Sequence, residues 1–480
     1  MKINPFATIK ELKTSLEKKE ISSKELLSFC IERFKKYDPI IKSALEIFSE
    51  ESILQQSCND GLLAGIPGIF KDNIAQKDRG MTCGSKILET FIAPYDSTAS
   101  RRMKKSGALL IGRANCDEFA MGTSGETSYF EKTTNPWDVS RVPGGSSSGS
   151  IAAVAAGFVP WALGSETGGS VRLPAAFCGI VGLKPTYGLI SRYGLVAYAS
   201  SLDQIGIATR TVEDNALVLS TLAGQDIHDS TTLAVEKKDY TKQLDGSIKK
   251  GLRVGIIGKA LNADGMDPEI VKAIEMAIKE LEKLGATFTH VDLPALDYSA
   301  AAYFIISRAE AASNFARYDG VRYGFRAKDA QNLMEMYEQT RAQGFGQEVK
   351  RRILVGNYTL SAGHQDEYYG SAKKVQQLIR DEFTETFKHV DLLLMPTHAI
   401  VPFKFGAYAD NALALDLQDY FTCPVNLAGL PAISIPCGFT KENLPIGYQL
   451  IGPHLSEELL YQIAHAYEQK TPWHTMHPKI

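Results

Sequence analysis

The stretch that decides the fold is GGSSSGSIAAVAAGFVPWALGSETGGS, residues 144–170. Its middle is apolar: residues 150–159 are small and hydrophobic and predict a tightly packed helix, and residues 160–166 predict a buried strand. Both ends are crowded with Gly and Ser. Chains rarely place such residues beside an apolar core unless the backbone needs a close approach or a hydroxyl group is to react.

Other buried strands are predicted on both sides of this segment. Residues 62–70 and 107–115 predict strands before it, and residues 390–400 and 431–439 predict strands near the end of the chain. Between them, residues 251–294 predict a strand–helix–strand unit. Because strands alternate with helices, we expect an α/β fold with a mostly parallel sheet.

Length and composition indicate a large globular enzyme. The chain has 480 residues, of which 44% are hydrophobic and 22% charged, and no low-complexity linker divides it, so we expect one domain. A net charge of −3 and a pI of about 6.3 argue against a broad basic surface for nucleic acid. Seven cysteines without a C-x-x-C pair indicate a reducing compartment and no zinc framework. We find no signal peptide and no apolar run long enough to span a bilayer.

The Gly-Ser run at 144–150 has three possible interpretations. A flexible linker does not fit, since the run leads directly into a segment built for close helix packing. A phosphate cradle at a helix N-terminus fits the glycines, but the Gly-Lys-Ser/Thr ending of a nucleotide P-loop is missing. The third interpretation is the G-x-S-x-G pattern of a nucleophile elbow, which would make Ser147 the attacking group, with His398 or His454 as its base.

A second motif, Thr-Gly-Gly-Ser at 167–170, favours a different catalytic role for the Gly-Ser run. Consecutive backbone N–H groups in such a run can converge on one point and form an oxyanion hole beside the final hydroxyl. That serine needs a base, and a neutral lysine is a known alternative to histidine. Lys71 ends the apolar strand of residues 62–70, where burial would lower its pKa. We therefore expect Ser170 and Lys71 to act together.

Taken together, the three segments resemble the amidase signature family. Its pattern is a Lys in K-D-N, a Gly-Gly-Ser-Ser loop about seventy-five residues later, and a T-G-G-S-[IV]-R loop twenty-four residues further, and this chain has all three. By resemblance Ser170 is the nucleophile, Ser146 the bridging serine and Lys71 the base. The resemblance also implies a cis peptide bond between Gly145 and Ser146. The implied oxyanion hole consists of the backbone N–H groups of Thr167, Gly168, Gly169 and Ser170.

The resemblance further implies the architecture. It predicts a large central mixed, mostly parallel sheet covered by helices on both faces, in a single domain over residues 1–480. We expect a helical N-terminal segment over about 1–60, a core over about 61–225 and 385–480, and an intervening region over about 226–384 that carries substrate-recognition residues. Two small departures from the family pattern are Ser148, where Gly is frequent, and Glu166, where Asp is frequent.

Longer stretches resemble one branch of the family, the glutamine-hydrolysing subunits of tRNA-dependent amidotransferases. They include NCDEFAMGTSGETSYF (115–130), LKPTYGLISRYGLVAYASSLDQIG (183–206), GQEVKRRILVGNYTLSAG (346–363) and QDYFTCPVNLAGLPAISIPCG (418–438). Glutamine needs a cation for its α-carboxylate and a carboxylate for its α-amino group. By resemblance Arg352 and Asp419 have these tasks, and Tyr303 makes a third contact.

This branch also implies partners and cofactors. We expect no cofactor or metal in this chain, and ATP and Mg²⁺ at a partner subunit that activates Glu-tRNA(Gln), Asp-tRNA(Asn) or both. The expected assembly is a cytoplasmic heterotrimer with subunits B and C, in which the partner holds most of the tRNA. Two alternatives stay open at this point, a free-standing amidase for another small amide and a scaffold or nucleotide-binding protein. Cys178, beside the nucleophile loop, is expected to be a packed apolar residue.

Overall fold

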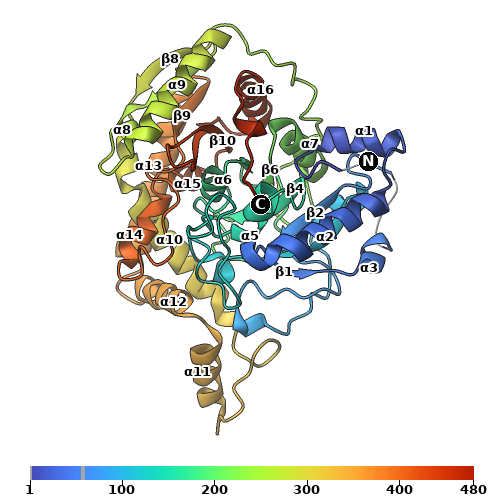
Figure 1. The fold of residues 1–480 in the computed structure, drawn as a ribbon. Coiled ribbons are helices and arrows are strands. Elements are labelled where there is room, and N and C mark those ends of the chain that lie inside the picture. Colours follow the sequence, from blue (N-terminus) through green and yellow to red (C-terminus); the bar gives the residue numbers. More distant parts are fainter. Residues whose placement is uncertain (1–2, 56–59) are drawn as a thin grey trace.

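The centre of the fold is a sheet of eleven strands (Figure 1). The computed structural model describes residues 3–55 and 60–480. The strand order is β1-β3-β2-β4-β6-β5-β10-β11-β9-β7-β8. The strands are β1 (Ala44–Ile47), β2 (Pro67–Lys71), β3 (Leu109–Ala114), β4 (Trp161–Glu166), β5 (Val181–Lys184), β6 (Gln204–Thr209), β7 (Arg253–Ile257), β8 (Thr287–Val291), β9 (Leu392–Pro396), β10 (Ala432–Phe439) and β11 (Pro445–Ile451).

The sheet is mixed, as expected, but it is not mostly parallel. Four neighbouring pairs are parallel, namely β2 with β3 and β4, and β7 with β8 and β9. The other six pairs are antiparallel. Each of these six includes β1, β5, β6 or β11, four strands that the apolar pattern of the sequence did not reveal. The expectation of a mostly parallel sheet was therefore wrong.

Helices cover both faces of the sheet (Figure 1). In one layer α5 and α6 contact each other, α5 lies on β2, β3, β4 and β6, and α6 lies on β5, β10 and β11. In another, α16 contacts both α7 and α9 and packs with them on the sheet. Every residue of α5 and α6 is buried, which agrees with the small apolar residues of their sequences. These helices are α5 (Ser148–Ala155), α6 (Arg172–Cys178), α7 (Val212–Leu222), α9 (Pro268–Leu284) and α16 (Glu457–Glu468).

The N-terminal segment begins with two capped helices. Thr8 and Ser22 each form a capping box with the glutamate three residues later, and these boxes start α1 (Ile9–Glu17) and α2 (Ser23–Ile41). The segment is not wholly helical, since β1 adds a strand to the edge of the sheet beside β3. It also contains the short helix α3 (Glu50–Leu54).

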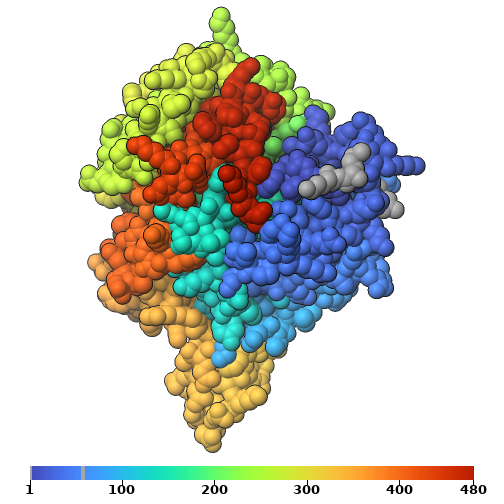
Figure 2. Space-filling model, viewed as in Figure 1, coloured from blue at the N-terminus to red at the C-terminus, as the bar shows by residue number. Residues whose placement is uncertain are grey.

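A second group of helices packs at the side of the sheet and forms its own apolar cluster. Within it, α10 contacts α12, α13 and α15, and the helix α11 lies in an arm that projects from the rest of the molecule (Figure 1, Figure 2). The other helices are α4 (Thr98–Lys105), α8 (Gly258–Leu261), α10 (Ser299–Asn314), α11 (Leu333–Gly344), α12 (Gln347–Leu360), α13 (Ser371–Thr386), α14 (Ala412–Asp416) and α15 (Cys423–Ala428). Of the helices in the described part of the chain, none has the length and apolar character needed to cross a membrane.

Candidate active site

Three chain segments meet where the parallel strands β2 and β4 end. Lys71 is the last residue of β2, and residues 167–170 follow the end of β4 directly. Ser146 and Ser147 precede α5, which packs on both strands. The carboxyl ends of neighbouring parallel strands lie at the same edge of a sheet, so this topology brings together the three motifs identified in the sequence.

Lys71 is completely buried and contacts the Gly-Ser loop. Its Nζ lies 2.7 Å from Ser146 Oγ, 3.2 Å from Ser147 Oγ and 3.3 Å from the carbonyl oxygen of Ser165. Burial lowers the pKa of Lys71 to about 8, although Cys116 and Asp117 nearby oppose the shift. A sizeable neutral fraction therefore exists near physiological pH, as a lysine base requires.

The Ser147 hydroxyl has no histidine partner within the described ranges. Ser147 Oγ donates to the Ser165 carbonyl at 3.1 Å and accepts from the Ser165 N–H at 3.2 Å. His398 instead lies against Phe177 and bonds the backbone of Ile400 through Nδ1, and burial lowers its pKa to about 4. This arrangement contradicts the nucleophile-elbow interpretation of the Gly-Ser run.

The peptide bond between Gly145 and Ser146 is cis, as the family resemblance implied. Asp117 packs against this bond: its backbone N–H donates to the Ser146 carbonyl at 3.2 Å, and a Cβ on Gly145 would lie 2.0 Å from Asp117 Oδ2. The carboxylate of Asp117 in turn accepts from the backbone N–H groups of Gly125 and Thr127, each at 3.0 Å. The segment 115–130 therefore forms the wall that positions the bridging serine.

The loop 167–170 presents backbone donors without partners. Its four N–H groups donate no hydrogen bond to any residue that the structure describes. The following two N–H groups, of Val171 and Arg172, both donate to Glu166 Oε2 at 3.0 Å. Glu166 also forms a fully buried ion pair with Arg172. The loop is thus fixed at its C-terminal end, while its four N–H groups stay unbonded to protein and are available to stabilise an oxyanion.

Two of the three predicted substrate contacts lie over this loop. A Cβ on Gly168 would be 2.4 Å from the Tyr303 hydroxyl oxygen, and one on Gly169 would be 2.8 Å from Asp419 Oδ1. These glycines are required because side chains approach the backbone closely, not because of unusual dihedral angles. Asp419 Oδ1 is buried without a partner, and burial raises the pKa of Asp419 to about 7 despite Arg352. A cationic group of a ligand would satisfy this oxygen.

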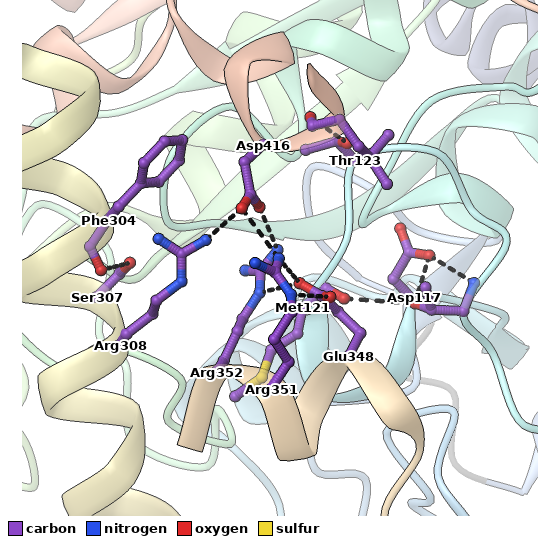
Figure 3. Close-up of polar contacts among 12 residues, drawn as sticks. Asp117, Met121, Thr123, Phe304, Ser307, Arg308, Glu348, Arg351, Arg352 and Asp416 are labelled. Carbon is purple, nitrogen blue, oxygen red and sulfur yellow. Dashed lines mark hydrogen bonds and ion pairs between the residues drawn. The ribbon is translucent and has the colours of Figure 1, made fainter. Parts of the chain in front are cut away.

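The third predicted contact, Arg352, is held by the protein in this structure (Figure 3). It donates to Glu348 Oε1 at 2.6 Å through Nε and to the hydroxyl of Tyr198 at 2.8 Å through Nη1. Arg351, its neighbour, is one-third exposed and pairs with Glu348 on the same helix. Arg352 is therefore the buried member of the pair, and it alone contacts Tyr198.

The hydrogen bond from Ser170 to Ser146 that a bridging role of Ser146 would use is not formed. Within the described ranges, no hydrogen bond joins Ser146 Oγ to Ser170 Oγ. Ser170 is nearly buried, and its carbonyl accepts the Ser147 N–H at 3.2 Å. The backbone thus ties the two serine loops together, and, among the described residues, the side chain of Ser170 has no protein partner that would have to be displaced.

The family model described as Amidase matches residues 25–461. This chain belongs to the amidase family. The A subunit of the glutamyl-tRNA(Gln) amidotransferase from Cyanothece sp. is 51% identical over 484 residues, which cover 99% of this chain and 100% of that protein. The crystal structure of the corresponding protein from Thermotoga maritima has a TM-score of 0.84 at 41% identity and covers 100% of this chain and 98% of its own. A 6-aminohexanoate cyclic dimer hydrolase has a TM-score of 0.87 at 25% identity and covers 100% of this chain and 99% of its own.

Within this amidase fold, two residues that hold the site together were not among the predicted site residues. Arg172 is fully buried and bonds Gln449, Asn426 and the carbonyl of Thr422, in addition to Glu166. The arginine of the T-G-G-S-[IV]-R motif was a signal for it. Asp203 accepts from the Thr167 hydroxyl at 2.6 Å, and its only signal was its place in the stretch 183–206, which resembles the amidotransferase branch.

Asp203 connects the loop 167–170 to the segment around Tyr198, which contacts Arg352. Besides Thr167, its carboxylate accepts the backbone N–H of Tyr198 at 2.9 Å and that of Ala199 at 3.0 Å. Tyr198 in turn receives the hydrogen bond from Arg352. Burial raises the pKa of Asp203 to about 6, with the hydrogen bonds opposing the shift. At neutral pH the group is therefore mainly ionised and fixes both segments.

We expect Thr167→Val to lower the amidase kcat about tenfold. The change preserves shape but leaves a buried carboxylate without one of its donors, a loss of roughly 1–3 kcal/mol. Thr167→Ser keeps the hydroxyl and is expected to stay within about threefold of wild type. Steady-state rates of ammonia release for the two variants check this, and equal rates would show that the hydrogen bond to Asp203 does not position the loop.

The described residues contain no group of three or more His, Cys, Asp or Glu side chains that could hold a metal ion. Six of the cysteines lie in the described part of the chain, and all six are free and buried. Among them, Cys178 ends α6, and burial raises the pKa of its thiol. A buried thiol with a raised pKa is a packed apolar residue and not a nucleophile.

Proposed function

We propose that this chain is the glutamine-hydrolysing subunit of a tRNA-dependent amidotransferase. The observation that carries the proposal is the loop 167–170, whose four unbonded N–H groups lie under Tyr303 and the unpartnered carboxylate of Asp419. An oxyanion hole so close to a free carboxylate suits an amide that also carries an ammonium group. Identity of 51% over the full length to the Cyanothece amidotransferase protein supports the same substrate.

In the proposed acylation step, the Ser170 hydroxyl attacks the side-chain amide carbon of glutamine. Its proton passes to Ser146, whose own proton moves to neutral Lys71 over the 2.7 Å contact. The N–H groups of residues 167–170 stabilise the oxyanion of the tetrahedral intermediate. The intermediate collapses as Lys71, again through Ser146, returns a proton to the departing ammonia.

Deacylation and transfer complete the cycle. Water attacks the glutamyl ester of Ser170 and loses a proton to Lys71 through Ser146; the ester C–O bond then breaks, glutamate leaves, and Lys71 returns the proton to the Ser170 oxygen. In bulk water at neutral pH, ammonia would be mostly ammonium and unable to attack, so we propose that it travels inside protein to the partner subunit. Arg352 binds the α-carboxylate of glutamine and Asp419 the α-amino group.

The remaining parts of the reaction are assigned to partners. We propose a heterotrimer with subunits B and C, in which a partner holds most of the misacylated tRNA and uses ATP and Mg²⁺ to activate it. This chain then needs no cofactor of its own. A slightly acidic chain agrees with this division of tasks. The free buried thiols agree with a location in the cytoplasm.

The test compares the chain alone with the chain co-expressed with subunits B and C. With the partners, Glu-tRNA(Gln), ATP, Mg²⁺ and glutamine, we expect Gln-tRNA(Gln) to form, measured by acid gel analysis of the aminoacyl-tRNA. The chain alone should turn over unrelated small amides far more slowly than the complex hydrolyses glutamine. Rapid hydrolysis of such amides without partners, and no Gln-tRNA(Gln) with them, would instead show a free-standing amidase.

A further inference from the structure

A single buried carboxylate, Asp416, gathers three arginines from two helices (Figure 3). Its oxygens lie 2.5 Å from Arg308 Nη2, 2.9 Å from Arg351 Nη2 and 3.4 Å from Arg352 Nη2. The side chain of Asp416 is 6% exposed, and those of Arg308 and Arg352 are 8% exposed. Because solvent hardly reaches Asp416, Arg308 and Arg352, the contacts with Asp416 decide how these two guanidinium groups are oriented.

The position of Asp416 in the fold is as informative as its contacts. It is the last residue of α14, three residues before Asp419. Arg308 lies on α10, the helix that carries Tyr303, and Arg352 lies on α12. One carboxylate therefore connects the three elements that carry all three proposed substrate contacts.

Two of the three guanidinium groups, those of Arg308 and Arg352, are buried, whereas Arg351 is one-third exposed, and the carboxylates that they contact are those of Asp416 and Glu348. Arg308 Nε is also buried without a hydrogen-bond partner, while its Cζ lies 4.5 Å from the centre of the Phe304 ring. A buried guanidinium donor without a partner, on the helix beside the buried Arg352, favours an anionic ligand group.

The contacts of Arg352 leave part of its guanidinium available for such a group. It has five N–H donors. Three are used, by Glu348 at Nε, Tyr198 at Nη1 and Asp416 at Nη2. One N–H on each terminal nitrogen thus has no protein partner in the described ranges, and two such donors can bind one carboxylate in a bidentate manner. The three acceptors fix the plane in which those donors point.

We propose that Asp416 is a positioning residue that determines specificity for amides bearing an α-carboxylate. It acts through Arg352, whose guanidinium it orients, while Arg308 offsets its charge and holds it in place from α10. The inference rests on the proposed function, since it concerns how that same site recognises glutamine. Asp416 itself does not touch the substrate.

The test compares two substrates that differ only in the group of interest. L-Glutamine carries the α-carboxylate, and 4-aminobutanamide is the same molecule without it. The kcat/KM for ammonia release is measured for both with the chain in complex with its partner subunits. We expect Asp416→Asn to lower the ratio of kcat/KM for glutamine to kcat/KM for 4-aminobutanamide at least tenfold, because one amide oxygen cannot accept from the three guanidinium groups that the two carboxylate oxygens bind.

Controls separate positioning from a general structural effect. Asp226 is a buried carboxylate that bonds Thr98 and Ser191, and Asp226→Asn is expected to leave the ratio unchanged. In an Arg352→Met background, Asp416→Asn should change the ratio less than threefold, because the group through which it acts is gone. Asp416→Glu keeps the negative charge, so its ratio of the two kcat/KM values should lie closer to wild type than that of Asp416→Asn. If Asp416→Asn does not fold, the Asp416→Glu enzyme is compared with wild type instead.

Several outcomes would overturn the inference. Equal losses for both substrates would show that Asp416 only supports the fold. A higher ratio in Asp416→Asn would show that the extra positive charge outweighs orientation. The inference would also be contradicted if the ratio of kcat/KM values were as low in Asp416→Glu as in Asp416→Asn. Failure of the proposed function looks different, because the wild-type complex would then not hydrolyse glutamine at all.

Discussion

Ser170→Ala is expected to lower glutamine hydrolysis by about 10⁴-fold or more, since loss of a nucleophile leaves only binding and the oxyanion hole. The backbone contact from Ser147 N–H to the Ser170 carbonyl is kept in this variant, so the two serine loops stay joined. Ammonia release gives the rate, and mass spectrometry of the trapped wild-type enzyme should locate the glutamyl ester on the peptide that contains Ser170.

Two neighbouring serines provide matched controls for this loss. Ser148 Oγ bonds only Thr133 among the described residues, so Ser148→Ala should retain nearly full activity. Ser147→Ala removes one of three acceptors of Lys71 Nζ and is expected to cost about tenfold, while Ser146 and the Ser165 carbonyl still hold the amine. An active Ser170→Ala enzyme together with an inactive Ser147→Ala enzyme would reverse the assignment of the nucleophile.

The sequence predicts some strands well and others not at all, and this difference explains the error about the sheet. Strands β3, β4, β7, β8, β9 and β10 lie within the predicted segments, β2 ends one residue beyond its own, and every parallel pair joins two of these seven strands. The missed strands lack a clear pattern: β1 and β5 have only four residues each, and glutamines, Gln204 in β6 and Gln449 in β11, interrupt the apolar character of the other two. Short or interrupted strands depend on pairing with neighbours for their structure, so no local signal identifies them.

In the site, too, residues in short motifs could be assigned from the sequence, whereas residues defined by contacts far apart in the chain could not. Lys71, Ser146 and Ser170 could be assigned because each lies in a short motif at a set spacing. Arg172 bonds Gln449 and Asn426, which are 277 and 254 residues away in the sequence. Asp416 is 108 residues from Arg308. Such contacts depend on the folded topology, so the motifs predict the reacting groups but not the residues that position them.

Lys71→Met is expected to reduce glutamine hydrolysis by about 10⁴-fold, because the variant keeps the volume of the buried side chain and removes the base. A matched control is Lys184, the other lysine whose side chain is fully buried in the described part of the chain. Its Nζ donates to the carbonyl of Pro185 at 2.8 Å, away from both serines, and Lys184→Met should keep a measurable rate. Similar losses of glutamine hydrolysis in the two variants would mean that removing either buried lysine disturbs the fold and that Lys71 has no specific role as the base.

The dependence of wild-type activity on pH tests the role of Lys71 without a substitution at that position. The pKa of Lys71 is lowered to about 8 by burial, so the neutral, active form increases as the pH rises. At pH 7 about one molecule in ten carries neutral Lys71, and kcat/KM should rise with pH, more steeply below about pH 7, where the Asp419 carboxyl (pKa about 7) also becomes protonated, and level off above about pH 9. Burial also lowers the pKa of Lys184, to about 7, so the Lys184→Met enzyme is measured in parallel. If kcat/KM of the Lys184→Met enzyme still rises near pH 8, the rise is caused by Lys71. If the rise disappears in this variant, Lys184 is the titrating group and Lys71 is not the base.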